Sequence, residues 1–441
     1  MMGVEVNLAE VLGYNLSPKK IEVLRHFLKY RGMTGEQLLC ALKPDKFNRR
    51  ELINTNYNNR PTQLRQANKY IEALREEGLL TNDTLYPKKR ADYHYLTKDG
   101  FEIASTIHGV QIGKIGTGYN DDFGDFQYEL HKPPHKQIHH HLRLIDFFLQ
   151  LENVRSDHPE LNIDYRDNRY VSDKYPLPKT KKGSKQKFKK FMPDGEVMLG
   201  NKRYWVEIDT GSERSDILTD KFEGYAQYIE HQLSNDNPIA EGILFISGTD
   251  RSSQYNRRWG TILMSFFKGI GDWGSSINLI AGTLSDVEDI VLREIQEGER
   301  FRKFVKDMEF YQERSRNYEG TNIIRSPLNK KGYKHSLSIR QNNQEPVAFV
   351  YERVDGYETR GLSRILEYSK VRPQELKKIK KMVPVLYYYG EERPPFNYNI
   401  FTEPEEAEKI FSNSLWVNLK DDPQFYNIDG EKVEVSNPFL L

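Results

Sequence analysis

The chain has 441 residues, of which 37% are hydrophobic, 29% are charged and 12% are aromatic, a composition typical of folded domains. This length exceeds what one hydrophobic core usually serves, so we expect two or three domains. A single cysteine excludes an internal disulfide framework and a multi-cysteine zinc site. The first residues lack a secretory pattern, and no apolar run approaches the roughly 18 residues of a membrane span, so we expect a cytoplasmic protein without a membrane partner.

The formal net charge of +1 conceals a local excess of basic residues. Residues 1–120 hold 18 Lys and Arg against 13 Asp and Glu, and a second basic block follows later in the chain. We therefore expect any surface that binds a polyanion to be local, rather than to cover the whole protein.

The N-terminal segment has the pattern of three helices followed by a hairpin. Ser17-Pro18 predicts a helix start, and the helical spacing of apolar residues continues to Gly32. A capping box from Thr34 predicts a short second helix, and a third is predicted between Pro61 and Gly78. Strands near residues 79–82 and 92–96 then form a hairpin, which makes this segment resemble a winged helix.

The basic residues of this segment gather on the two elements with which a winged helix contacts DNA. Its third helix enters the major groove and its hairpin grips phosphates. The candidate DNA-binding residues are Gln63, Arg65, Gln66 and Lys69 on the third helix, and Lys88, Lys89 and Arg90 at the hairpin tip. We expect double-stranded DNA as the partner. The alternative is a winged helix that contacts protein, with its basic residues solvated.

A glycine-rich stretch at residues 109–134 is predicted to be a linker, and a helical pattern resumes at Ile138. The run His139-His140-His141 opens this helix. Consecutive helical residues point in different directions, so the three side chains are not expected to converge on one metal ion. The run also departs from the His-apolar-His strand of a tyrosine relaxase. A structural role is favoured, and a contribution of His140 to a site is left open.

Three carboxylates follow a lysine-rich stretch in the middle of the chain. Residues 174–190 hold eight lysines, for which a solvated loop and a phosphate contact are equally good interpretations. Asp194 then precedes a strand over residues 196–199, and a second strand over 203–208 leads through Glu207 to Asp209. Alternation along the second strand places Glu207 and Asp209 on one face, and pairing of the two strands would bring Asp194 beside them.

Three converging carboxylates predict a metal site. Like charges at close range repel, so such a cluster is normally neutralised by a hard cation, here Mg²⁺ or Mn²⁺. The ion can activate water for attack on a phosphodiester. A helix over residues 216–232 follows and carries Lys221, whose amine could reach back to the carboxylates. Two further strand-helix units over residues 241–305 complete this segment. The alternative is that Asp194 caps a turn and Glu207 and Asp209 are ordinary strand-face charges.

A Pro-Asp, a short hairpin and Glu-x-Asp between helices resemble the PD-(D/E)XK nuclease superfamily. More narrowly, a winged helix followed by Pro193-Asp194-Gly195, the element at residues 207–213, and then Lys221 and Tyr225 resembles the replication-relaxation family of bacterial plasmids and mobile elements. The likeness covers about residues 17–295 and implies that Asp194 and Glu207 bind the metal. Asp209 stands where the superfamily has lysine. Either Lys221 supplies that charge, or the site has lost cleavage and only binds DNA.

These patterns predict an α/β multidomain protein. We expect a winged-helix DNA-binding domain at residues 1–108 and a linker at 109–134. A PD-(D/E)XK-like mixed sheet flanked by helices is expected at residues 135–305. A small α/β module of unknown role is expected at residues 306–441. The resemblance places the protein in the bacterial cytoplasm.

The leading hypothesis is a DNA-processing protein of a plasmid or mobile element, acting as a metal-dependent endonuclease or nickase that a winged helix directs to its site. In this hypothesis Asp194, Glu207 and Asp209 hold Mg²⁺ or Mn²⁺ and orient water, and Lys221 stabilises the scissile phosphate. One alternative is a non-catalytic origin-binding or regulatory protein that keeps the nuclease fold. Another is a tyrosine nickase, for which 27 tyrosines supply candidates. Enzyme activity and homodimerisation are left open.

Overall fold

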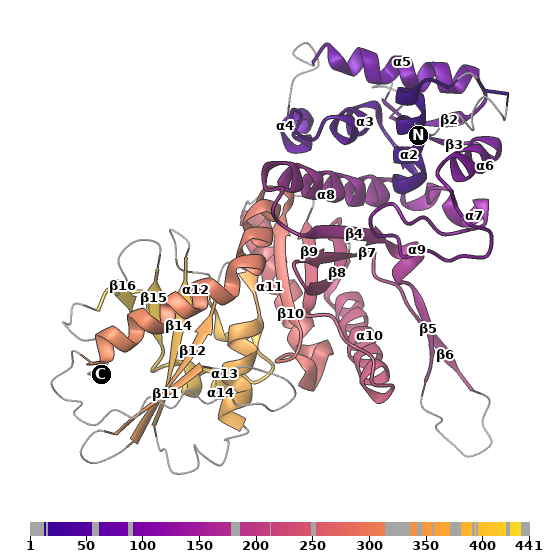
Figure 1. Ribbon diagram of the computed structural model, residues 1–441. Helices are drawn as coiled ribbons and strands as arrows, with labels where there is room; N and C mark the ends of the chain where they lie inside the picture. Colours follow the sequence, from indigo (N-terminus) through magenta and orange to yellow (C-terminus); the bar gives the residue numbers. More distant parts are fainter. Residues whose placement is uncertain are drawn as a thin grey trace, which may run out of the picture.

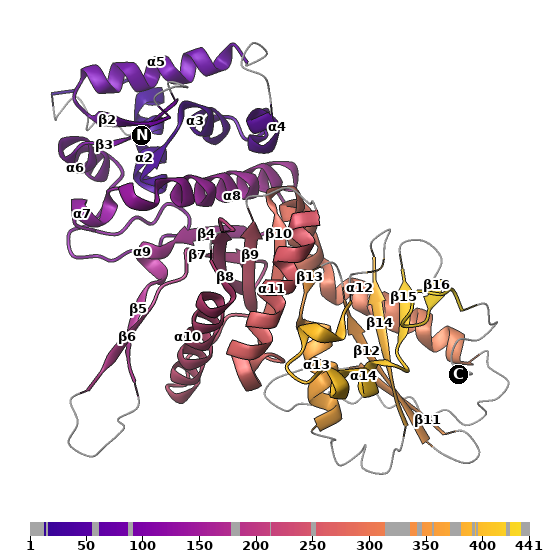
Figure 2. The ribbon, with the colours of Figure 1, turned by 180° about the vertical axis from the view of Figure 1, so that it is seen from behind.

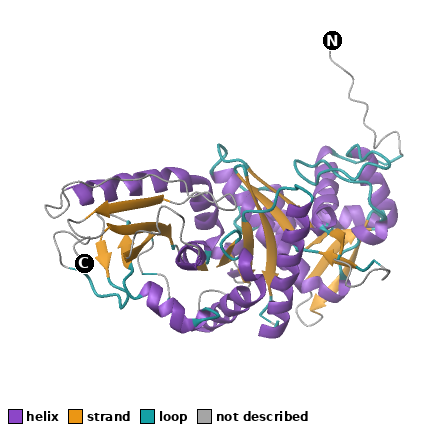
Figure 3. Ribbon diagram, turned by 90° about the horizontal axis from the view of Figure 1, so that it is seen from below, coloured by secondary structure: helices purple, strands orange, loops and turns teal. Residues whose placement is uncertain are grey.

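The computed structural model describes residues 13–433, except residues 15, 55–60, 87–90, 178–185, 212, 248–252, 314–335, 342–345, 355–356, 371–380, 390–392, 394–395 and 420–423. An N-terminal domain of helices and a small sheet packs on one end of a central sheet, and a C-terminal domain lies beyond the other end (Figure 1). Seen from below, the three bodies lie in one row (Figure 3). This is the mixed α/β architecture that the sequence predicts.

The N-terminal domain forms where its capping signals predict. Ser17 accepts a hydrogen bond from the Lys20 backbone at the start of its first helix, and Thr34 forms a complete capping box with Gln37. The elements are α2 (Pro18–Tyr30), β1 (Gly32–Met33), α3 (Gly35–Leu42), α4 (Arg49–Asn54), α5 (Gln63–Glu76), β2 (Leu80–Tyr86), β3 (Ala91–Leu96) and α6 (Lys98–Ile107). The sheet order is β1-β3-β2. The order of helices and hairpin agrees with the sequence prediction, and its interpretation as a winged helix belongs to the proposed function.

Two helices of this domain differ from the sequence prediction. α4 lies between the second and third predicted helices, and α6 follows the predicted hairpin, two places where the sequence analysis expects no helix. Gly100 within α6 obscures the helical pattern, yet the fold requires a glycine there, because a Cβ atom would lie 2.0 Å from the Leu79 carbonyl oxygen. The buried side chains of Phe101 and Ile103 pack α6 against the domain core.

The central sheet is mixed and carries helices on both faces. Its order is β13-β10-β9-β8-β7-β4, with β8, β9 and β10 parallel and β7 antiparallel to both of its neighbours. The strands are β4 (Ile163–Asp167), β7 (Gly195–Leu199), β8 (Lys202–Asp209), β9 (Gly242–Ser247), β10 (Asn278–Thr283) and β13 (Tyr357–Glu358), and the flanking helices are α8 (Ile138–Asp157), α10 (Ser215–Ser234), α11 (Ser253–Ile270) and α12 (Val287–Glu313).

Alternation along β8 distributes its side chains between two cores. Tyr204, Val206 and Ile208 pack in the core that contains α8 and the start of α12. Trp205 packs in the opposite core with α10 and α11. Glu207 therefore lies on the α10 side of the sheet, as the period of two predicts.

Between α8 and β7 the chain forms a two-stranded ribbon. A single helical turn, α9 (Asn168–Val171), leads into β5 (Asp173–Pro176), which pairs antiparallel with β6 (Phe188–Phe191). The ribbon extends away from the sheet, alongside α10, in both opposite views (Figures 1 and 2). The other turn of helix between the domains, α7 (Tyr128–His131), lies in the segment predicted as a linker.

The C-terminal segment forms a sheet of its own and also completes the central one. Its order is β11-β12-β14-β15-β16. The elements are β11 (Ser336–Gln341), β12 (Pro346–Arg353), α13 (Arg360–Lys370), β14 (Lys381–Tyr388), α14 (Pro404–Phe411), β15 (Leu415–Asn418) and β16 (Gln424–Tyr426). β13, from the same segment, pairs with β10 of the central sheet. Phe304 of α12 packs against the C-terminal sheet, so this helix spans both domains. No helix among the described residues is long and apolar enough to cross a membrane.

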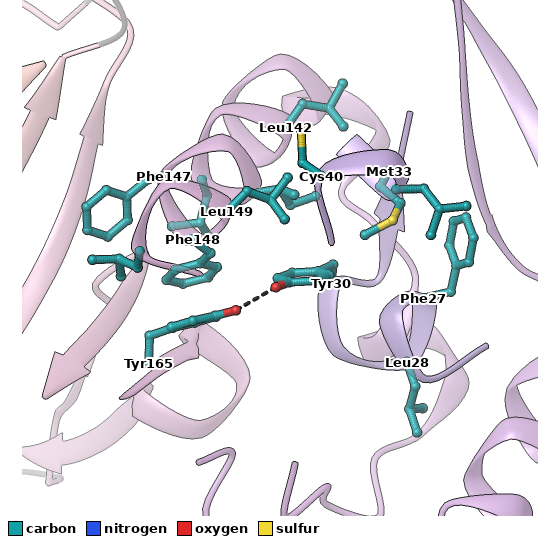
Figure 4. Close-up of a cluster of buried hydrophobic side chains, with 14 of the residues drawn as sticks. Phe27, Leu28, Tyr30, Met33, Cys40, Leu142, Phe147, Phe148, Leu149 and Tyr165 are labelled. Atoms are coloured by element: carbon teal, nitrogen blue, oxygen red, sulfur yellow. Dashed lines mark hydrogen bonds between the residues drawn. The ribbon is translucent and has the colours of Figure 1, made fainter. Parts of the chain in front are cut away.

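Aromatic side chains join the N-terminal domain to the central sheet. The hydroxyl oxygens of Tyr30 on α2 and Tyr165 on β4 are 2.5 Å apart, and Phe148 of α8 stacks on the Tyr165 ring (Figure 4). Asp146 of α8 accepts hydrogen bonds at 2.6 Å from both Gln37 and Arg49. Apolar burial and buried polar bonds across this contact therefore fix the N-terminal domain on α8.

A buried ionic network joins the central sheet to the C-terminal sheet. The Arg353 guanidinium, at the end of β12, donates to both Glu358 carboxylate oxygens, at 2.9 and 2.8 Å, and also contacts Glu294 and Glu297 of α12. Burial alone would raise the pKa of Glu294, but the positive charges of Arg353 and Arg360 outweigh it and hold that pKa well below its usual range.

Replacing Arg353 should make the protein unfold more easily, because it removes the bidentate cation of buried Glu358 and one of the two cations that neutralise buried Glu294. We expect Arg353→Met to lower the free energy of unfolding by about 3–5 kcal/mol in urea titrations. Lys98→Met is the control, since the Lys98 side chain is 70% exposed and its pair with Glu102 should contribute at most about 1 kcal/mol. Equal losses in the two variants would contradict a stabilising network.

Candidate functional site

An open pocket lies beside the end of β8, between α8, α10 and the base of the ribbon. Its volume is about 630 Å³. Its walls include the carboxylates of Asp194 and Glu207, the amine of Lys221, and His140. The pocket therefore brings together three of the four predicted catalytic residues, which come from the β7–β8 hairpin and from the helix that follows it.

Glu207 is the buried acid of this pocket. Its side chain leaves β8 toward α10, where the Tyr225 hydroxyl donates to Oε1 at 2.6 Å and the Lys221 amine donates to Oε2 at 3.1 Å. Lys221 and Tyr225 are four residues apart on α10 and so share one helix face. The Lys221 amine also lies 3.1 Å from the Glu213 carboxylate. Lys221 thus reaches back to the strand, as the sequence predicts.

Burial acts on the pKa of both Glu207 and Lys221. Burial raises the pKa of Glu207 to about 7, with a further increase from the charge of Asp194 and an opposing decrease from Lys221. Burial would lower the pKa of Lys221, but the carboxylates of Glu207 and Glu213 outweigh it and raise that pKa. The lysine therefore stays charged while Glu207 exchanges its proton near neutral pH.

Asp194 is held at the open end of the β7–β8 hairpin. Its backbone amide donates to the Val206 carbonyl at 3.0 Å, and its Oδ2 accepts from the Ile208 amide at 2.8 Å. Its Oδ1 lies 2.8 Å from Nε2 of His140. Burial would lower the pKa of His140, but the hydrogen bond and charge of Asp194 outweigh it and raise that pKa. The hairpin geometry thus brings Asp194 beside Glu207 as predicted.

The three consecutive histidines of α8 diverge, as the helical geometry predicts. His140 reaches Asp194, and His139 is an exposed residue of the pocket wall. His141 is buried on the opposite side, with Nε2 at 3.1 Å from the Tyr30 carbonyl oxygen, and burial lowers its pKa to about 3. The sequence left a role for His140 open, and the structure places it against a predicted site residue.

Asp209 does not lie where a third metal ligand is expected, because its carboxylate is paired with an arginine. Arg258 of α11 donates to both of its carboxylate oxygens at 2.8 Å, and the Gly211 amide donates at 2.9 Å. The planar guanidinium matches a carboxylate in this bidentate geometry and neutralises its charge. Arg258 lies 49 residues from Asp209 in sequence, so no local pattern could have revealed the pair.

The carboxylates therefore do not form the predicted three-ligand metal site. Among the described residues, no group of three or more His, Cys, Asp or Glu side chains is placed to hold a metal ion. The oxygens of Asp194 and Glu207 already accept from Ile208, Tyr225 and Lys221 or lie beside His140. A hard cation would compete with His140 and Lys221 for these oxygens. Binding of Mg²⁺ or Mn²⁺ stays a prediction.

The predicted DNA-contacting residues are described only in part. Gln63, Arg65, Gln66 and Lys69 are exposed along α5, whose opposite side is buried. Lys88, Lys89 and Arg90 lie outside the described residues. The exposed face of α5 is thus available to a partner.

A family model described as replication-relaxation matches residues 24–240. This segment belongs to the replication-relaxation family. The matched segment includes α5 and the pocket residues Asp194, Glu207 and Lys221, whereas Arg258 and the C-terminal sheet lie beyond it. Membership implies an interaction with DNA and a part in replication or relaxation. No curated protein and no solved structure matches the chain.

The raised pKa of Glu207 makes stability depend on pH in a defined window. The folded protein holds this proton up to about pH 7, whereas an unfolded glutamate loses it near pH 4.5. The stability that protonated Glu207 contributes is complete below pH 4.5 and is lost as the pH rises through 7. Relative to Glu207→Gln, the wild type should lose up to about 3 kcal/mol across this window, at roughly 1.4 kcal/mol per pKa unit.

Urea titrations of both proteins between pH 4.5 and 7.5 measure this difference. His140 titrates in both proteins and so largely cancels. Glu223→Gln, an exposed position on α10, makes the same chemical change away from the pocket and should give a curve parallel to the wild type. A difference that is flat with pH for Glu207→Gln would show that Glu207 ionises like an exposed glutamate.

Proposed function

We propose that this protein binds double-stranded DNA of a plasmid or mobile element and cleaves one of its phosphodiester bonds in the pocket of Asp194, Glu207 and Lys221. The N-terminal domain acts as a winged helix that selects the site, and the central domain acts as a PD-(D/E)XK-like core. The observation that carries the proposal is the buried Glu207, held between Lys221 and Tyr225 on the wall of an open pocket.

The residues of the pocket supply complementary parts of phosphodiester hydrolysis. With a pKa of about 7, Glu207 is suited to accept a proton from attacking water near neutral pH. The Lys221 ammonium beside it is suited to stabilise negative charge on the phosphate oxygens. Asp194, fixed by the Ile208 amide and His140, completes the acidic side of the site.

The remaining wall of the pocket favours a polyanion. Lys136, Lys189 and Lys190 line it together with Lys221. Cations around an entrance attract and orient a phosphate backbone. The tight apposition of the N-terminal domain and α8 also gives DNA bound on α5 a fixed position relative to the pocket.

The alternative is a regulatory or origin-binding protein that keeps the nuclease fold without cleavage. One observation favours it: Asp209 occupies the position of the superfamily's lysine, and Arg258 binds it as a structural ion pair. In this alternative Lys221 and His140 neutralise the two remaining carboxylates permanently, and DNA binding alone is the function.

A nicking assay separates these functions. Supercoiled plasmid that carries the cognate origin, incubated with the protein and Mg²⁺ or Mn²⁺, should become nicked, and chelation should stop the reaction. Because loss of a general base typically costs 10²–10⁴-fold in rate, Glu207→Gln should slow nicking by at least about 100-fold. Glu223→Gln, on the exposed face of the same helix, should nick like the wild type.

Each of the other outcomes would indicate a different function. Nicking that persists in Glu207→Gln and leaves a covalent protein–DNA adduct would indicate a tyrosine nickase. Nicking that continues in the presence of chelator would show that cleavage does not need Mg²⁺ or Mn²⁺. Cognate DNA that is bound but left intact under all metal conditions would establish the binding-only alternative.

Substitution on α5 should weaken duplex binding. Arg65→Ala combined with Lys69→Ala removes two exposed cations, so the affinity for duplex DNA should fall, and the slope of log affinity against log salt should flatten by about 2. Fluorescence anisotropy over a salt series measures both quantities. Lys98→Ala on α6 serves as the control, with one exposed cation removed elsewhere on the domain. Unchanged binding by the double variant would place the duplex on another surface.

A further inference from the structure

The β5–β6 ribbon is anchored by one face only. On its inner face Phe191 stacks on Tyr228 of α10 with ring centroids 3.8 Å apart, and Tyr175 is buried against the same tyrosine. Lys189 also lies on this face, where its amine donates to Gln227 at 2.9 Å. The ribbon is thus fixed to the helix that carries Lys221, and its other face points away from the protein.

The outer face of the ribbon combines positive charge with an exposed aromatic ring. Lys174 and Lys190 are direct cross-strand partners and are both exposed. The next pair outward joins Pro176 to Phe188, a residue that is 54% exposed and whose ring centroid lies 5.2 Å from the Lys174 amine. Like charges directly opposite each other destabilise a sheet, and a half-exposed phenylalanine gains only part of the free energy of burial. An anionic partner with flat apolar faces would offset both costs.

The outer face leads directly into the pocket. Phe188, Lys190, Met192 and Asp194 follow one another at every second position, and the last three line the pocket, as do Lys189, Phe191 and Pro193 between them. Met192 is 55% exposed and lines the pocket between the lysine and the carboxylate. A linear ligand that lies along this row would therefore pass from the ribbon to Glu207 and Lys221.

We propose that the outer face of the β5–β6 ribbon binds single-stranded DNA and guides it into the pocket. Lys174 and Lys190 contact the phosphates, and Phe188 stacks on a base. The aromatic ring selects a single strand, because the faces of an unpaired base are open to stacking, whereas those in a duplex are covered by neighbouring bases. This inference rests on the proposed function, in that it names the form of the DNA that reaches the pocket.

Anisotropy with a fluorescent 20-nucleotide oligothymidine, in chelator so that no cleavage occurs, tests the proposal in the full-length protein. Stacking on an aromatic side chain contributes about 1–3 kcal/mol per base, so Phe188→Ala should weaken binding by roughly 5- to 150-fold. Phe188→Tyr keeps the ring and should bind like the wild type. Lys174→Gln with Lys190→Gln should flatten the salt slope by about 1.4, because each phosphate without its lysine partner reduces the slope by about 0.7.

Controls separate the ribbon from general charge and folding effects. Met264→Ala removes another exposed hydrophobic side chain, 46% exposed on α11, and should leave oligothymidine binding unchanged. A 20-base-pair duplex should bind Phe188→Ala as tightly as the wild type. The proposal is overturned if Phe188→Ala binds oligothymidine like the wild type, or if its affinity falls equally for single strand and duplex.

Binding to the ribbon is measured independently of cleavage. If the wild type never nicks DNA but Phe188→Ala still binds single strands more weakly, the nuclease proposal fails and the ribbon proposal stands. If nicking is confirmed but the ribbon variants bind single strands normally, the ribbon proposal fails and the nuclease proposal stands.

Discussion

The burial of one carboxylate, Glu207, is the constraint on which the candidate site depends. A charged group on a strand beneath a helix is costly unless donors meet it, and here Lys221 and Tyr225 of α10 both do so. This requirement fixes the rotation of α10 against the sheet. It also produces the raised pKa of Glu207, because the donors offset the desolvation only in part. The structural cost of Glu207 and its raised pKa thus arise from the same environment.

Helix α8 connects the N-terminal domain to the pocket that contains Glu207. Asp146 accepts from Gln37 and Arg49, and His141 contacts the Tyr30 carbonyl, so one side of the helix is committed to the N-terminal domain. The adjacent His140 lies instead against Asp194 on the pocket wall. Because consecutive positions on one rigid helix serve the two contacts, a displacement of the N-terminal domain would move a side chain of the pocket.

Ion pairs determine what the acidic residues can do. Arg258 takes both oxygens of Asp209 and so removes it from any shared metal site, whereas Lys221 contacts Glu207 within an open pocket. A buried guanidinium pair is geometrically specific and costly to break. The flexible lysine beside solvent is easier to displace by a phosphate or a cation. The two acids on one strand face therefore have different roles.

Local patterns in the sequence were sufficient to predict the caps at Ser17 and Thr34, the β7–β8 hairpin, and the shared face of Glu207 and Asp209. These features follow from side-chain periods and capping chemistry within a few residues. Three others emerge only from the packed fold: Arg258 binds Asp209, β13 joins the central sheet, and the lysine-rich segment frames the pocket with a ribbon. Such contacts join residues distant in sequence, and which partners meet depends on how the helices and strands pack against one another, which local patterns leave undetermined.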